Sequence, residues 1–363
     1  MSLLSNLCRR SGRLSSKTAK SEEFDEGWYI SFYKDVGAAV AGGEFASGLD
    51  HYVRHGRSEH RLPSPARSRD VWSIPPEQRA EESGWYWMAH PLVQKRINTL
   101  ISGDPDCDAY SHLAQMLARR RWPLPIPSAV SLGCGFGGLE RSLTSRRVVR
   151  DIKGYDFSEA AIAEARRLAR QQQLRNVSYR VADLERLVLS PISVDAVFAH
   201  QSIHHIDGLE RLFSQIREAL KPHGIFHLHE FVGPNRFQWT KAQLDLVNEY
   251  LSSLPPRLRR LPSGAKKPLA RRPTVDAMIA SDPTEAVRSS EILVVLRSYF
   301  TIVDQHQIGG ALLHLALGEI AQNFDADEPE DRAHLERLFA LEDRMMVEGV
   351  IDSDFVVVTA RRV

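Results

Sequence analysis

The middle of the chain alternates between short apolar segments and longer segments that carry apolar residues at helical spacing. The short segments, which predict buried strands, are 129–132, 152–155, 177–181, 194–199 and 225–231. Helical spacing lies between them, most clearly in Ser158–Gln173 and Gly208–Leu220. Strands that alternate with helices are joined by right-handed crossovers, so the pattern predicts an α/β fold around a parallel sheet.

Helical patterns without strands flank this region. Aromatic residues recur at three- and four-residue steps in Phe24–Arg61, and prolines then accumulate up to Pro76, which is typical of a linker. The predicted units are a disordered basic tail at 1–20, a small helical module at 21–62, a linker at 63–80, a helical cap at 81–125 and an α/β domain at 126–363. Within that domain we expect a lid insertion at 233–290 and a helical insertion at 311–348.

Composition narrows the classes of function. The 363 residues carry a formal net charge of +1, so no overall field attracts nucleic acid or an anionic membrane. Three cysteines are too few for a disulfide scaffold and fit a reducing compartment. No apolar stretch approaches the ~20 residues of a membrane span, and no signal-peptide pattern opens the chain. We therefore expect a cytoplasmic protein without a nucleic-acid partner or a membrane span.

A glycine-rich segment, SLGCGFGG, joins the first predicted strand to a helix. Gly133 and Gly135 permit the turn and leave the backbone open to a ligand, and the helix start can hold an anion. Gly137 allows close packing of the helix on the strand. With Gly138, the segment fits the dinucleotide pattern GxGxxG, and with Gly137 it fits GxGxG. The glycines alone do not distinguish a site for NAD from a site for S-adenosylmethionine. They also do not exclude an ordinary tight turn between a strand and a helix.

Acidic residues follow the next two predicted strands. Asp156 ends the second strand, where a carboxylate can accept both hydroxyl groups of a ribose. Asp183 follows the third strand, where it suits the amine of an adenine ring that Leu184 can cover. A helix cap or a solvated loop acid is the lesser alternative for each of these residues, and together they indicate a nucleoside without identifying it.

Taken together, the motifs in Val130–Phe231 resemble a class I S-adenosylmethionine-dependent methyltransferase. The motifs are SLGCGFGG, GYDFS, VADLERL, DAVFAHQSIHHI and LKPHG. The resemblance implies a Rossmann-like seven-stranded sheet with its last strand antiparallel, closed by Phe300–His306 and Asp354–Ala360. It implies that the cofactor is held by Gly133, Cys134, Gly135, Gly137, Asp156, Phe157, Asp183, Leu184 and His200. Ser131 departs from the family, which usually has an acid at this position.

A second resemblance concerns the substrate. The segments HEFVGPNRFQW and DPTEAVRSSEI are similar to a bacterial subgroup of these enzymes that occurs beside glycan-building machinery. The module Phe24–Arg61 is similar to helical modules attached to bacterial glycosyltransferases. These similarities imply a sugar, nucleotide-sugar or glycan substrate and a glycosyltransferase partner.

Methyl transfer to a hydroxyl group needs a base, which we expect at the carboxyl end of the fourth or fifth strand. The catalytic candidates are His200, Glu230 and His204, and the substrate-contacting candidates are His205, Arg236 and Trp239. Each has a structural alternative: His200 can pack against the cofactor, the paired histidines can bond at a helix start, and Glu230 can pair with Arg236. No metal is expected, because the histidines near the fourth and fifth strands lack a cysteine set and a clear helical register.

The predicted function is S-adenosylmethionine-dependent O-methylation of a sugar or glycan hydroxyl group. The basic segment 257–272 is expected either to meet substrate phosphate or to remain a solvated loop. Three alternatives stay open: a catalytically weak binding or scaffold module in a glycan-assembly complex, a small-molecule methyltransferase, and a NAD-dependent dehydrogenase.

Overall fold

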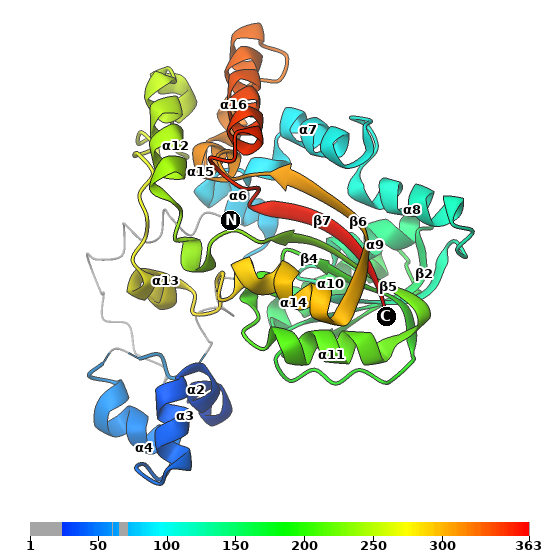
Figure 1. Cartoon of the computed structure of the whole chain (residues 1–363), viewed down its shortest axis with the longest axis vertical. Helices are drawn as coiled ribbons and strands as arrows, with labels where there is room; N and C mark the ends of the chain where they lie inside the picture. The colour runs from blue at the N-terminus through cyan, green and yellow to red at the C-terminus, as the bar shows by residue number, and fades with distance from the viewer. Residues whose placement is uncertain (1–23, 60, 65–71, 363) are drawn as a thin grey trace.

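A computed structural model describes residues 24–59, 61–64 and 72–362, so the predicted basic tail lies outside the described residues. A seven-stranded sheet runs through its centre in the order β3-β2-β1-β4-β5-β7-β6 (Figure 1). The strands are β1 (Ile126–Leu132), β2 (Val149–Asp156), β3 (Val177–Val181), β4 (Val194–His200), β5 (Leu220–Phe231), β6 (Phe300–Gly309) and β7 (Phe355–Arg362). The first five pair in parallel, and β7 pairs antiparallel with both β5 and β6. The predicted fold class is therefore confirmed.

The helices fall into three groups along the chain. Before the sheet lie α2 (Glu26–Phe32), α3 (Lys34–Ala41), α4 (Gly48–His51), α6 (Pro76–Ser83), α7 (Pro91–Ser102) and α8 (Ala109–Arg119). Between the parallel strands lie α9 (Gly138–Ser145), α10 (Glu159–Gln171) and α11 (Leu209–Ala219). After β5 lie α12 (Lys241–Ser253), α13 (Val275–Ser281), α14 (Ile292–Tyr299), α15 (Leu313–Leu317) and α16 (Pro329–Val347). Among the described residues no helix has the length and apolar character needed to cross a bilayer.

Alternation along the strands divides the core between the two faces of the sheet. On one face, Leu132 and Val197 pack with α11 and α14, and on the other, Ile126 and Phe198 pack with α8, α9 and α10. This arrangement follows from the period of two in a strand, which sends neighbouring side chains to opposite faces.

A third apolar cluster joins the two predicted insertions. Residues of α12, α15 and α16 pack with α7 and with Trp87, and Tyr250 of α12 donates to the carbonyl oxygen of His334 in α16 over 3.3 Å. Figure 1 shows α12 and α16 rising from the same side of the sheet. The segments 233–290 and 311–348 thus share one apolar cluster, which also takes in residues of the predicted cap.

The N-terminal helices α2, α3 and α4 surround a small apolar core of their own, made by Tyr29, Val36 and Tyr52. Two ion pairs link this module to loops of the α/β domain: Lys34 with Asp207 at 3.1 Å, and Arg186 with Asp25 at 3.6 Å. Because both pairs are largely exposed, each contributes little to stability.

Candidate functional site

The carboxyl ends of the parallel strands meet at a cleft of about 1030 Å³. Eight of the predicted cofactor residues line this cleft: Gly133, Cys134, Gly135, Asp156, Phe157, Asp183, Leu184 and His200. They come from the loops or ends that follow β1, β2, β3 and β4. The parallel sheet brings them together because it places all four strand ends on one edge.

The turn between β1 and α9 requires glycine at two places. Gly133 has φ of +67°, and a Cβ atom there would lie 2.3 Å from the Cβ of Ser202. Gly137 has φ of +72°, and its Cβ would lie 2.4 Å from the hydroxyl oxygen of Tyr179 on β3. Gly137 does not line the cleft. Its left-handed backbone and its contact with Tyr179 serve the close packing of α9 on the sheet, and its predicted contact with the cofactor stays a prediction.

Asp156 supports the glycine turn from the end of β2. Its carboxylate accepts hydrogen bonds from the backbone N–H of Gly135 at 2.8 Å and of Ser158 at 2.9 Å. Burial raises the pKa of Asp156, although these two bonds act in the opposite direction. Asp156 therefore holds the glycine turn through a hydrogen bond and also lines the cleft. Asp183 is half-exposed there and accepts from the backbone N–H of Glu185 at 2.9 Å.

A buried carboxylate lies behind the glycine turn. Glu140 on α9 is fully buried. Burial raises the pKa of its carboxyl group to about 7, although the hydroxyl group of Ser131 acts in the opposite direction. Ser131 is the position at which the methyltransferase family usually carries an acid. The structure thus places a carboxyl group close to this strand end from a neighbouring helix, although Glu140 itself does not line the cleft.

His200 lines the cleft at the end of β4. Its Nδ1 lies 2.7 Å from the hydroxyl oxygen of Tyr110 on α8, and its ring meets that of His229 edge-on. Burial lowers the pKa of His200, so its imidazole is neutral near pH 7. The fixed Nδ1 leaves only Nε2 available to a ligand.

His205 also lines the cleft and belongs to a short chain of hydrogen bonds. The hydroxyl group of Thr284 donates to Oδ1 of Asp282 at 2.7 Å, so its oxygen is left to accept from His205 Nδ1 at 3.1 Å. This order fixes the proton on Nδ1 and the lone pair on Nε2. Burial, followed by the neighbouring His204, lowers the pKa of His205. A neutral, oriented imidazole is the form required of a base.

Glu230 and His204, predicted as catalytic, lie beneath the cleft and do not line it. The Glu230 carboxylate accepts from the backbone N–H of Ser202 and of Ile203, at 2.9 and 2.7 Å, and lies 2.5 Å from His204 Nδ1. Burial alone would lower the pKa of His204, but Glu230 and the nearby Glu285 raise it to about 10. The network holds the loop after β4 in shape, which corrects the prediction that these two residues face the substrate.

Arg236 and Trp239 also lie away from the cleft. Arg236 donates to the carbonyl oxygens of Pro283 and Glu285, at 2.7 and 2.9 Å. Trp239 is fully buried and stacks on Phe237. Both side chains are thus part of the interior of the insertion, which corrects their prediction as substrate contacts.

The basic segment 257–272 is mostly exposed, but several of its basic side chains bond to the rest of the molecule. Lys267 is buried and donates to the carbonyl oxygen of Gly318, and burial lowers the pKa of its amine to about 8. Arg259 is buried as well and donates to the Lys267 carbonyl oxygen at 2.6 Å. Arg257 pairs with Asp331 of α16 at 2.5 Å. No residue of this segment lines the cleft.

Several cleft residues were not identified from the sequence. Trp72, in the predicted linker, donates from Nε1 to Asp282 at 2.9 Å and meets the His205 ring edge-on. Tyr86 donates to Gln201 at 2.8 Å. The N-terminal module adds Trp28 to the cleft wall. The aromatic residues of these segments were visible in the sequence, but helical spacing equally predicts that they pack in a core.

Residues 130–228 match the family model described as a methyltransferase domain. A sterol 24-C-methyltransferase from Candida albicans is 31% identical over 115 residues, which are 31% of this chain and 30% of that protein. A malonyl-[acyl-carrier protein] O-methyltransferase from Methylovorus sp. is 25% identical over 149 residues, which are 41% and 42% of the two chains. The chain thus spans less than half the length of these curated relatives.

Among solved structures, the chain is similar to an S-adenosylmethionine-dependent methyltransferase from Mesorhizobium loti. The sequence identity is 22%, the TM-score is 0.41, and the match covers 69% of this chain and 98% of that one.

Proposed function

We propose that this chain, whose residues 130–228 match a methyltransferase domain, is an S-adenosylmethionine-dependent methyltransferase. The observation that carries the proposal is that the glycine turn, Asp156 and Asp183 border one cleft at the carboxyl ends of parallel strands. The residues present suit this cofactor. The Gly133 turn leaves backbone beside the cleft without side chains, and the two acids can accept from ribose hydroxyl groups and an adenine amine.

The proposed acceptor is a hydroxyl group of a sugar or glycan. Trp28, Phe32 and Trp72 give the cleft aromatic walls, and such faces suit the apolar faces of sugar rings. The resemblance of the N-terminal module to those of glycosyltransferases supports the same class of acceptor and a glycosyltransferase partner. The curated relatives above carry names for sterol and acyl-carrier-protein methylation, so the sugar acceptor is our own inference.

S-adenosylmethionine supplies a methyl group already activated by its sulfonium, and the protein's main contribution is alignment and exclusion of water. Asp156 and the backbone of the glycine turn hold the nucleoside side of the cleft. We assign removal of the acceptor proton to Nε2 of His205, which is buried and has no hydrogen-bond partner among the described residues, whereas the Nδ1 proton is committed to Thr284. Glu230 and His204 act as positioning residues, since they fix the loop that carries His205.

The test is transfer of label from S-adenosylmethionine to a panel of nucleotide sugars and glycan fragments. For an acceptor so found, we expect His205→Ala to lower kcat by ~10²–10⁴-fold, the usual contribution of a positioned base. Cofactor affinity should stay close to that of the original chain. The variant Thr284→Val keeps the imidazole but removes its hydroxyl partner, so its loss of kcat should be smaller.

Unchanged turnover in His205→Ala would refute the role given to this histidine. Cofactor binding without methylation of any panel member would refute the sugar acceptor, while leaving the methyltransferase proposal in place.

A further inference from the structure

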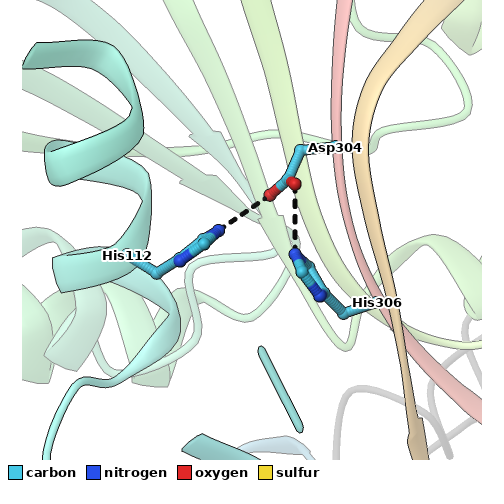
Figure 2. A group of neighbouring side chains, drawn as sticks. All are labelled: His112, Asp304 and His306. Atoms are coloured by element: carbon cyan, nitrogen blue, oxygen red, sulfur yellow. Dashed lines mark hydrogen bonds and ion pairs between the residues drawn. The ribbon is translucent and has the colours of Figure 1, made fainter. Parts of the chain in front are cut away.

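Two histidines and an aspartate meet at the edge of the sheet, and none of them lines the cleft. Figure 2 shows His112 on α8 and His306 on β6 pointing at the carboxylate of Asp304, which also lies on β6. His112 Nε2 lies 3.1 Å from Oδ2 of Asp304, and His306 Nε2 lies 3.1 Å from Oδ1 (Figure 2). One ligand atom from each residue lies within 4.8 Å of the others.

These separations resemble those between the ligands of a tetrahedral metal ion. Zinc binds imidazole nitrogen and carboxylate oxygen at roughly 2.0–2.2 Å, so two ligands of one tetrahedral ion lie roughly 3.4 Å apart. The two observed nitrogen–oxygen distances of 3.1 Å run to different oxygens of Asp304, and the three ligand atoms lie within 4.8 Å of one another, so modest shifts of the side chains would admit an ion. The three side chains are about one-fifth exposed, which leaves a path for an ion while limiting competition from water.

The charge of the group favours a cation. With neutral imidazoles, His112 and His306 offer lone pairs and Asp304 supplies one negative charge. Imidazole suits zinc, copper, iron and nickel, whereas magnesium and calcium prefer sites made of oxygen alone. Three protein ligands leave a fourth position for solvent or an outside ligand.

We propose that His112, Asp304 and His306 form a binding site for one divalent transition-metal ion, with zinc as the best match. The ion would link α8 to β6. His112 and Asp304, which lie on these two elements, are 192 residues apart in the sequence. Because binding to the folded chain alone stabilises it by mass action, zinc would raise the temperature of unfolding. The site is independent of the proposed methyl transfer, since it shares no residue with the cleft.

The experiment is a titration of the chelator-treated full chain with Zn²⁺ by calorimetry and with Co²⁺ by visible absorption. We expect one ion per chain and a Co²⁺ spectrum typical of tetrahedral coordination. His306→Gln and Asp304→Asn should each weaken binding by more than ~10-fold, a loss that even outer-shell partners produce. His55→Gln, which removes an exposed histidine of the N-terminal module, is the matched control and should bind as the original chain does.

Thermal unfolding gives a second readout. Zinc should raise the unfolding temperature of the original chain and of His55→Gln, and should leave that of Asp304→Asn and His306→Gln unchanged. Absence of binding to the original chain would overturn the proposal. It would also be overturned if both site variants bound zinc as tightly as the control.

Discussion

Polar and aromatic side chains lie in different places at the carboxyl ends of β1–β4 and in the segments after β5. At the strand ends, Gly133, Asp156 and His200 line the cleft, as their positions next to predicted strands indicated. After β5, Trp239 and Lys267 are buried within the insertions, although their residue types suggested ligand contacts. Sheet geometry fixes where a strand-end residue lies, whereas the place of a residue in an insertion depends on packing that short patterns do not encode.

The sharpest test of this difference compares two tryptophans. Trp239→Ala should lower the free energy of unfolding by about 3–5 kcal/mol, because it removes a fully buried indole from the core of the insertions. Trp72→Ala, at the half-buried cleft wall, should cost about 1 kcal/mol and instead raise KM for the acceptor. Denaturant unfolding of both variants measures the contrast, and equal losses of stability would remove the distinction between the two regions.

Within the strand-end region, two glycines of the same loop provide the next test. Gly133→Ala should lower the free energy of unfolding by about 2–4 kcal/mol, from a left-handed backbone and a clash with Ser202. Gly138→Ala is the matched control, because nothing lies within 4 Å of its added Cβ and its backbone is helical. Alanine there should be neutral or stabilising by up to about 1 kcal/mol. Similar unfolding curves for the two variants would contradict the geometry of the turn.

The buried Glu140 predicts a pH effect of smaller size. Its pKa is about 7 in the folded chain, above the ordinary glutamate value of 4.5, so the folded chain holds the proton more tightly than the unfolded chain does. The free energy of unfolding should therefore fall as the pH rises from about 4.5 to 7, and stay lower above pH 7. Glu140→Gln, which mimics the protonated acid, should reduce the fall between about pH 4.5 and pH 7 by about 1–3 kcal/mol.

Glu81→Gln, at an exposed glutamate of α6, is the control for this effect and should follow the original pH curve. If Glu140→Gln also followed that curve, the carboxyl group would titrate as it does in water, and its burial behind the glycine turn would be refuted.

The parallel α/β sheet and the cleft residues before β5 could be predicted because they depend on local patterns, whereas the antiparallel closing strand was expected only from the family resemblance. A glycine turn after a strand and an acid at the end of the next strand meet in any parallel sheet of this connectivity. The bond from Gly135 N–H to Asp156 shows the result, since it joins two such loops.

The remaining parts of the site depend on partners far apart in the chain. His205 is oriented by Thr284, which lies 79 residues further on, and the His112–Asp304 pair spans 192 residues. Glu230 was placed correctly at the end of β5, but its bonds to the N–H groups of Ser202 and Ile203 turn it beneath the cleft. No spacing within one segment encodes such contacts.

Calorimetric titration with S-adenosylmethionine and its demethylated product, S-adenosylhomocysteine, tests the central claim most directly. We expect both to bind the original chain with one site per chain, NADH to give no heat of binding, and Asp156→Ala to weaken both by at least ~10-fold through loss of the turn contact. If neither compound bound the original chain, the methyltransferase proposal would be contradicted, and the chain would be better described as a binding module built on this fold.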